Sequence, residues 1–185
     1  MTFPDYPIDP PSRFSEKATY AFARIAGLAV AAGLLVGLNA VASPGAPVSL
    51  TRSVDVKGDA AKVWALIGPY CAIKDWHPAI GACSLDGKTP ATRTLVTKDG
   101  SATFIELQTA RDDAKHRYSY TFTSAPIPVK RYSSTLKVEA LGPHVSRITW
   151  SGAYTPDPGK EKAASDALTG IYESGLEAIR ARLAK

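Results

Sequence analysis

The sequence predicts an α+β fold for residues 43–185: a seven-stranded, curved antiparallel sheet with two short helices and one long C-terminal helix. Runs of alternating apolar and polar residues, separated by turn residues, recur between Val48 and Thr155, which is typical of antiparallel strands. The last segment, from Lys160 to about Ala184, repeats its apolar residues at helical spacing. An antiparallel sheet with one apolar face needs a cover, and only this segment is long enough to supply it.

Residues 1–42 differ in composition from the rest of the chain. Residues 1–24 are rich in proline and lack an apolar period, which predicts disorder. Residues 25–42 contain no charge and end in Ala40-Val41-Ala42, a pattern that fits a signal-peptide h-region followed by a cleavage site. The long, nearly neutral segment before them leaves an uncleaved membrane anchor open. Either alternative places Ser43 and the following domain in the periplasm or another extracytoplasmic space, secreted or anchored.

The overall composition is that of an ordinary globular chain, with 45% apolar and 21% charged residues. The net charge of +5 comes from basic residues that are scattered along the chain. Nucleic acid is therefore not expected as a partner.

The domain begins with a strand and two short helical segments. Residues 47–58 alternate and end at a glycine, as a strand does. Asp59 is a suitable N-cap for a helix over residues 60–67, which Gly68-Pro69 ends. Residues 70–80 form a second short helical or turn segment, which ends at His77 because the residue before a proline avoids helical geometry.

Six further strands are expected before the last helix. Their residues are 80–87, 92–100, 101–113, 116–125, 131–142 and 144–155. Alternation places three sets of residues on common faces: Tyr118, Tyr120 and Phe122; Tyr132, Ser134, Leu136 and Val138; and Ile148, Trp150, Gly152 and Tyr154. The helical stripe consists of Ala164, Leu168, Ile171, Tyr172, Gly175, Ile179 and Leu183. A curved sheet that packs against this stripe is expected to enclose an apolar ligand site.

Several groups of residues resemble a known superfamily. They are Asp75 to Ile80 with Cys83; Arg93 with Leu95; Asp99, Gly100, Glu106 and Leu107; Asp113, Tyr118 and Tyr120; Pro126 to Val129 with Tyr132; and Ser146 to Pro156. Together they resemble the START-like superfamily, also called SRPBCC, and within it the polyketide cyclase/dehydrase branch with the MxaD-like exported proteins of methanol oxidation. The resemblance covers roughly residues 48–185. It implies a helix-grip fold, whereas activity varies across the superfamily, from lipid carriers and receptors to cyclases.

The stretch around Trp76-His77-Pro78 contains the first candidate site. His77 is a candidate general base or ligand donor at the mouth of the pocket. The favoured interpretation is a structural corner in which His77 bonds the backbone. Cys71 and Cys83 flank this corner and are the only cysteines. They could pair, bind metal or supply a nucleophile, but their spacing fits no zinc motif, and a disulfide is expected in an exported domain.

Arg93 and Glu106 lie in strands of a predicted hairpin. They are either a buried pair aimed at a polar ligand group or a surface pair, and we favour an inward Glu106. Only His77 and Glu106 are candidate catalytic residues. The predicted ligand-binding residues are Trp76, His77, Arg93, Glu106, Tyr118, Tyr120, Tyr132, Trp150, Tyr154, Leu168 and Tyr172. Gly175 is expected either to allow close packing or to leave cavity space. If it leaves cavity space, Gly175→Leu would fill the cavity without disturbing the fold.

These observations predict an exported protein that binds a small hydrophobic or amphipathic molecule between the sheet and the last helix. Two alternatives stay open. One is an accessory protein for a periplasmic partner enzyme, as the MxaD-like resemblance implies, and the other is an enzyme of cyclase or dehydratase type. No cofactor or metal is expected, because the sequence contains no nucleotide loop, haem motif or metal cluster. The membrane is a partner only if residues 25–42 are retained.

Overall fold

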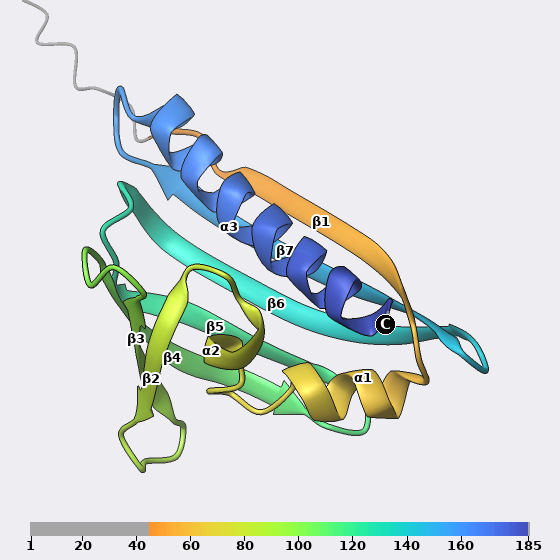
Figure 1. The fold of residues 1–185 in the computed structure, drawn as a ribbon. Helices are drawn as coiled ribbons and strands as arrows, with labels where there is room; N and C mark the ends of the chain where they lie inside the picture. Colours follow the sequence, from red (N-terminus) through yellow and green to blue (C-terminus); the bar gives the residue numbers. More distant parts are fainter. Residues whose placement is uncertain (1–44, 185) are drawn as a thin grey trace, which may run out of the picture. The chain divides into compact units, whose positions relative to one another are not determined.

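A computed structural model describes residues 45–184 (Figure 1). Seven strands form one antiparallel sheet, in the order β1-β7-β6-β5-β4-β3-β2. The strands are β1 (Val48–Lys57), β2 (Ile80–Leu85), β3 (Thr92–Thr97), β4 (Thr103–Asp112), β5 (Arg117–Ser124), β6 (Val129–Gly142) and β7 (Val145–Pro156). The helices are α1 (Ala60–Ile67), α2 (Ile73–Trp76) and α3 (Glu161–Leu183). The fold class predicted from the sequence is therefore confirmed.

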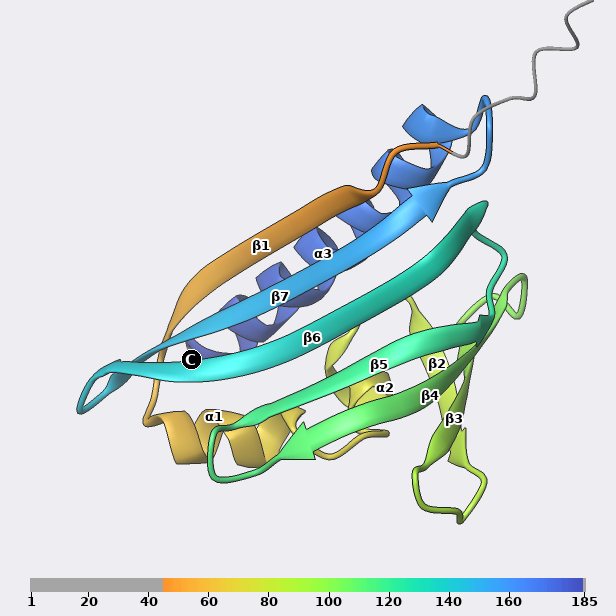
Figure 2. The ribbon, with the colours of Figure 1, turned by 180° about the vertical axis from the view of Figure 1, so that it is seen from behind.

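The sheet curves around α3, which lies across its inner face (Figure 1). The pairing register shifts within the β2–β3, β4–β5 and β6–β7 pairs, where one strand carries an extra residue. Such bulges bend a strand and increase its twist. Seen from behind, the outer face of the sheet is not covered by any helix of the described residues (Figure 2).

The core lies between the inner face of the sheet and α3. The aromatic and aliphatic residues that alternation assigns to one face are buried, among them Tyr118, Leu136 and Trp150. Ala164, Leu168, Tyr172 and Ile179 on α3 are also buried, as the helical spacing predicts. Trp150 and Tyr172 stack with ring centroids 4.5 Å apart, so they join β7 to α3. Gly152 makes this stack possible, because a Cβ there would collide with the Tyr172 hydroxyl.

The helix α1 has the bounds and the N-cap residue that the sequence predicts. Asp59 occupies the N-cap position, but its side chain makes no bond to the helix backbone. Its carboxylate instead accepts from Lys62 Nζ at 3.1 Å and contacts His144 Nδ1 at 3.0 Å. The predicted N-cap position is therefore confirmed, whereas the carboxylate bonds these two side chains and not the helix backbone.

The predictions for residues 1–42 cannot be compared with the structure, which describes residues 45–184. The predicted disordered segment 1–24 and the predicted signal sequence or anchor 25–42 lie outside this range. Between residues 45 and 184, no helix has the length and apolar character needed to cross a bilayer.

Candidate functional site

A cavity of about 90 Å³ lies between the inner face of the sheet and the helices α2 and α3. Its lining residues are Ile73, His77, Ala79, Ile80, Leu95, Thr97, Phe104, Glu106, Tyr120, Phe122, Tyr132, Trp150, Leu168 and Ile171. Eight of these fourteen side chains are apolar, and the other six combine apolar surface with one or two polar groups. This mixture is typical of small-molecule sites, in which apolar walls give affinity and a few polar groups fix orientation.

The cavity has an open end and a closed end. The lining residues that reach solvent mark its mouth: Ala79, Thr97, Phe104, Phe122 and Ile171. The buried polar and aromatic residues mark its inner end: Glu106, Tyr120, Tyr132 and Trp150. A ligand that enters with its apolar part near the mouth would thus bring its other end to Glu106 and Tyr120.

Glu106 forms a buried ion pair with Arg93 at the inner end. The two residues face each other directly across β3 and β4, and Arg93 Nε donates to Glu106 Oε2 at 2.6 Å. Arg93 is 0% exposed and Glu106 is 4% exposed, so the inward alternative is the one observed. Burial raises the pKa of the Glu106 carboxyl, and the charge and hydrogen bond of Arg93 oppose this. Because a fully buried guanidinium without a counter-charge is very costly, we take the pair as ionised.

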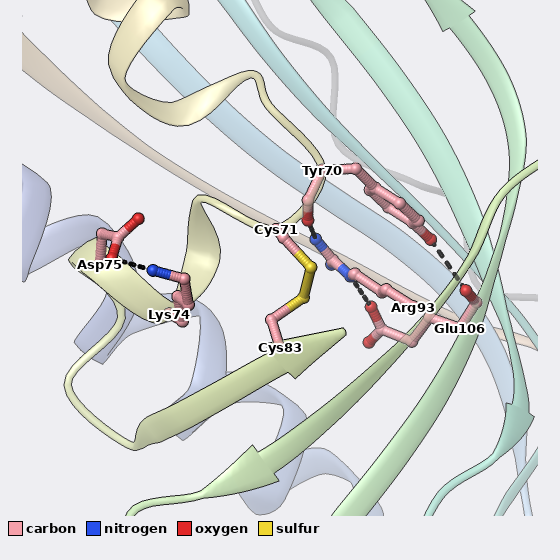
Figure 3. The surroundings of a disulfide bond; sticks show 7 residues. All are labelled: Tyr70, Cys71, Lys74, Asp75, Cys83, Arg93 and Glu106. Carbon is pink, nitrogen blue, oxygen red and sulfur yellow. Dashed lines mark hydrogen bonds and ion pairs between the residues drawn. A yellow bond between two sulfur atoms is a disulfide. The ribbon is translucent and has the colours of Figure 1, made fainter. Parts of the chain in front are cut away.

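Arg93 is held from three sides. Its guanidinium carbon lies 4.1 Å from the centre of the Tyr70 ring and 5.1 Å from that of Tyr120. Its Nη1 donates to the carbonyl of Tyr70, the residue before Cys71 (Figure 3). Cys71 is bonded to Cys83, as predicted. The ion pair and the disulfide therefore fix the same corner, where the chain leaves α1 and enters α2.

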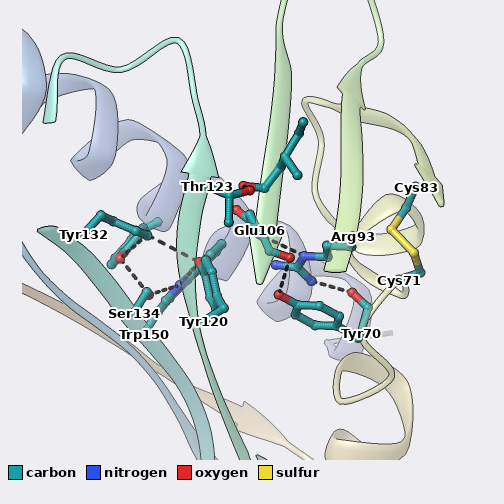
Figure 4. A network of polar contacts seen from close by, with 12 residues as sticks. Tyr70, Cys71, Cys83, Arg93, Glu106, Tyr120, Thr123, Tyr132, Ser134 and Trp150 are labelled. Atoms are coloured by element: carbon teal, nitrogen blue, oxygen red, sulfur yellow. Dashed lines mark hydrogen bonds and ion pairs between the residues drawn. A yellow bond between two sulfur atoms is a disulfide. The ribbon is translucent and has the colours of Figure 1, made fainter. Parts of the chain in front are cut away.

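A chain of hydroxyl groups fills the space beside the ion pair (Figure 4). Ser134 Oγ donates to the Ser151 carbonyl at 2.9 Å and lies 2.8 Å from the Tyr172 hydroxyl. The Tyr172 and Tyr132 hydroxyls are 2.8 Å apart. Burial raises the pKa of Tyr172 to about 12 and that of Tyr132 well above its usual value, so both hydroxyls stay protonated.

Tyr120 connects this chain to the cavity. Its hydroxyl accepts from Trp150 Nε1 at 3.0 Å, and that indole also donates to Ser134 Oγ at 3.0 Å. The Tyr120 and Tyr132 hydroxyls are 3.4 Å apart, the longest separation in the network. The hydrogen bond between these two hydroxyls is therefore the weakest of the hydroxyl–hydroxyl bonds in this chain.

His77 is a buried link between the α2–β2 corner and α3. Its side chain is 3% exposed, so it does not sit at the rim, where we expected it from the sequence. The Ala79 N–H donates to Nδ1 at 3.2 Å, which leaves Nε2–H to donate to the Ile171 carbonyl at 3.0 Å. Burial lowers the pKa of His77, consistent with this neutral tautomer. The carboxylate of Asp75 contacts Lys74 Nζ at 2.6 Å instead of the imidazole.

Gly175 lies where α3 comes closest to this corner. A Cβ at this position would be 2.7 Å from His77 Cδ2 and 2.9 Å from Trp150 Cζ3. The glycine thus serves close packing and leaves no cavity space. The expectation that Gly175→Leu would fill the cavity and leave the fold intact is wrong, because there is no room for the side chain.

The structure separates the predicted ligand-binding residues into two groups. Those that line the cavity are His77, Glu106, Tyr120, Tyr132, Trp150 and Leu168. Those that are buried behind the lining are Trp76, Arg93, Tyr118, Tyr154 and Tyr172. Phe104 and Phe122 line the cavity but were not predicted as ligand-binding, although they share the faces of Glu106 and Tyr120. Ile73 and Ile80 were also missed, and no periodicity in the short α2 corner points to them.

Within residues 45–184, no cluster of histidine, cysteine, aspartate and glutamate side chains has the geometry to hold a metal ion. The site offers a carboxylate, tyrosine hydroxyls and apolar surface. Both ring nitrogens of His77 are hydrogen-bonded to backbone groups. The lone pair of Nδ1 accepts from the Ala79 N–H, so it is not available to a molecule in the cavity. The arrangement is suited to holding a molecule in one orientation.

Comparison with known proteins gives the following similarities. Residues 47–184 match the model of a family described as "Polyketide cyclase / dehydrase and lipid transport". The protein XoxI from Bacillus cereus is 33% identical over 74% of this chain and 96% of its own, with a TM-score of 0.70. A protein from Bacillus thuringiensis is 32% identical over 75% of this chain and 100% of its own, also with a TM-score of 0.70.

A START superfamily protein from Mycobacterium smegmatis is only 14% identical but covers 73% of this chain and 96% of its own, with a TM-score of 0.62. At that identity the similarity concerns the fold alone. No curated protein matches the chain in sequence.

Proposed function

Because the chain belongs to the family described as polyketide cyclase / dehydrase and lipid transport, we propose that it is an extracytoplasmic binding protein for a small hydrophobic or amphipathic molecule. The observation that carries the proposal is the cavity between the sheet and α3, with its apolar mouth and its polar inner end. The family description supports a ligand-binding role for the fold, and the lining residues supply the surface on which such a ligand would be held.

The size of the cavity limits the ligand. At about 90 Å³ it is smaller than the roughly 300–1,000 Å³ of pockets for drug-sized molecules. A compact molecule therefore fits the proposal best, and a longer one would need the side chains at the mouth, such as Phe122 and Ile171, to move.

Binding can be tested with an apolar probe molecule and with a substitution that fills the mouth of the cavity. Toluene titrated into the purified protein should shift the amide resonances of Ile171 and Phe104 saturably. Ile171→Trp should weaken this binding at least tenfold, because the larger side chain occupies the mouth. Leu183→Trp is the matched control, since Leu183 is a half-buried aliphatic residue of the same helix that does not line the cavity. Toluene binding that is equal in both variants would place the ligand site elsewhere.

Binding without turnover is supported by the state of the two candidate catalytic residues. Glu106 Oε2 is engaged by Arg93, and both nitrogens of His77 are engaged by backbone groups. If a turnover assay is found and His77→Ala abolishes it while binding is unchanged, the enzyme alternative of cyclase or dehydratase type replaces this proposal.

The extracytoplasmic location is supported by the Cys71–Cys83 disulfide, because such bonds persist in oxidising compartments. We propose that residues 25–42 direct export. Protein recovered from the periplasm should begin at Ser43 if Ala40–Ala42 is a cleavage site. Intact protein that begins at Met1 in the membrane fraction would support the anchor, and a cytoplasmic protein with free thiols would contradict export.

A second proposal is an accessory role toward a periplasmic partner enzyme. It is supported by the similarity to XoxI and by the outer face of the sheet, which no helix of the described residues covers (Figure 2). A photo-crosslinker placed at Thr135, on that face, should capture the partner in cells, whereas one at Ala178 on α3 should not. Capture at Ala178 alone would contradict an outer-face interface.

A further inference from the structure

We infer that the cavity selects a neutral molecule whose polar end is a single hydroxyl group, which would donate to Glu106 Oε1 and accept from the Tyr120 hydroxyl. The inference rests on the proposed binding function and names the ligand class for the same cavity. It follows from the polarity of the hydrogen bonds at the inner end, taken one group at a time.

The acceptor is the second carboxylate oxygen of Glu106. Oε2 is taken by Arg93 Nε, and no hydrogen bond among the described residues involves Oε1. Figure 3 shows Oε1 pointing away from the guanidinium. Glu106 lines the cavity, and Oε1 is not among the fully buried polar atoms that lack a partner, so we take this oxygen to face the space that a ligand would fill. An ionised carboxylate oxygen is acceptor-only, and a ligand must bring it a donor.

The donor is the Tyr120 hydroxyl, and the network beside it fixes its direction. Ser134 has one proton, which goes to the Ser151 carbonyl, so Tyr172 must donate to Ser134. Tyr132 must then donate to Tyr172, and Tyr120 is left without an acceptor closer than 3.4 Å. Burial raises the pKa of Tyr120 well above its usual value, so the proton is present.

The positions of Glu106 and Tyr120 in the sheet allow both side chains to bind the same hydroxyl group of a ligand. In the β4–β5 register Tyr120 is opposite Gln108, which makes Tyr120 and Glu106 diagonal neighbours on one face of the sheet. Such neighbours are about 7–8 Å apart at Cα, within reach of long side chains. A hydroxyl group is both donor and acceptor, so it satisfies the two at once.

Charged ligands fit this end poorly. Arg93 already neutralises Glu106, so the pair has no net charge to attract a cation. A carboxylate ligand would face the acceptor oxygen of Glu106 with another acceptor. Desolvation of an ion without a counter-charge is costly in either case. An apolar molecule without a polar group would leave Oε1 and the Tyr120 proton unpaired.

The test compares toluene with three derivatives that carry one polar group at the para position: p-cresol, 4-methylbenzoate and 4-methylbenzylammonium. Isothermal titration on wild-type protein should show p-cresol binding at least about tenfold more tightly than toluene, as expected for a hydrogen bond to a charged group. The two ions should bind no better than toluene. Tightest binding of the ammonium or of the benzoate would overturn the inference.

Substitutions of Tyr120 and Glu106 test whether these two side chains cause the preference for p-cresol. Tyr120→Phe removes the donor but leaves Trp150 Nε1 its bond to Ser134, so the fold should persist. It should reduce the preference for p-cresol over toluene at least threefold. Tyr118→Phe is the matched control, because Tyr118 is equally buried on the same face of β5 but does not line the cavity. Glu106→Gln should abolish most of the preference, provided that circular dichroism shows a folded protein.

The outcomes separate the two proposals. If neither toluene nor p-cresol binds at saturating concentration, the binding function fails and the inference fails with it. If both bind equally well to wild-type protein, the cavity binds apolar molecules and only the hydroxyl selectivity is wrong. A preference that persists undiminished in both Tyr120→Phe and folded Glu106→Gln would also overturn it.

Discussion

His77 shows how a residue that looks catalytic in the sequence can be structural in the fold. A histidine between a tryptophan and a proline suggests a general base, yet its two nitrogens join the Ala79 amide to the Ile171 carbonyl of α3. Protonation would turn Nδ1 from an acceptor into a donor that faces another donor. The stability of the corner therefore depends on the neutral imidazole.

We expect a pH dependence of stability that comes from His77. Burial lowers its pKa in the folded protein below the ordinary value of 6.5, so its contribution is complete above pH 6.5. As the pH falls below 6.5, the unfolded chain binds a proton that the folded protein does not, and the free energy of unfolding drops by up to ~1.4 kcal/mol per pH unit. The drop ends at the folded-state pKa.

Urea unfolding at several pH values between 7.5 and 5 should show this drop in the free energy of unfolding of wild-type protein. Its slope should correspond to the uptake of about one proton on unfolding. His77→Gln should be less stable at neutral pH, since it cannot reproduce both bonds, but should depend less steeply on pH over the same range. Identical slopes for the two proteins would assign the pH dependence to other groups.

Two glycines of α3 should respond oppositely to the same substitution. Gly175→Ala should destabilise the protein by about 1–3 kcal/mol, because its Cβ would be 2.7 Å from His77 Cδ2 and overpacking is costly. Gly170→Ala should stabilise it by up to ~1 kcal/mol, since no atom lies within 4 Å of its added Cβ and alanine favours a helix. Thermal unfolding of both variants checks the pair, and a stabilising Gly175→Ala would contradict the close packing.

At the scale of elements, the α2 corner is attached to the sheet by a covalent bond and an ion pair. The disulfide closes a loop over a sequence separation of 12 residues, and Arg93 binds the Tyr70 carbonyl at the same place. The short α2 makes few hydrogen bonds of its own, so its position relies on these attachments. Ile73, His77 and Ala79 line the cavity from this corner, and its geometry therefore sets one wall of the site.

Removal of the disulfide should loosen this wall. The variant Cys71→Ser/Cys83→Ser should lose about 3 kcal/mol of stability, by the chain-entropy estimate for a loop of this length. Urea unfolding with and without reductant gives the internal control: reductant should lower the stability of wild-type protein by a similar amount and leave the variant unchanged. A wild-type protein insensitive to reductant would mean that the bond contributes nothing.

The elements were more predictable than the site. Period-two alternation and turn signals such as Asp99-Gly100 placed the strands within a few residues, and the helical stripe placed α3. Alternation could not decide whether Arg93 and Glu106 face inward, because apolar residues occupy both faces of β4. It also could not separate Tyr120, which lines the cavity, from Tyr118, which lies behind it on the same face. That difference depends on where the α2 corner packs, which is a tertiary contact.

At the scale of the whole molecule, ligand binding and stability should be linked. A molecule that binds only the folded state raises the free energy of unfolding, by about 2.7 kcal/mol at a ligand concentration of 100 times Kd. Wild-type protein saturated with p-cresol should show this rise in urea unfolding. Ile171→Trp should show little or none at the same concentration. A rise of equal size in both proteins would indicate binding outside the cavity.

The strand order has a consequence for how the chain reaches this state. Strands β2 to β7 each pair with a neighbour in sequence, and such hairpins need only short loops to close. The first strand is the exception, because Val48 pairs with Tyr154 and Lys57 pairs with Val145. Its partner is the last strand, so it must stay unpaired until nearly the whole chain is available. A polypeptide made or exported from its N-terminus would therefore keep β1 open until the end, and the sheet edge that β1 forms would close last.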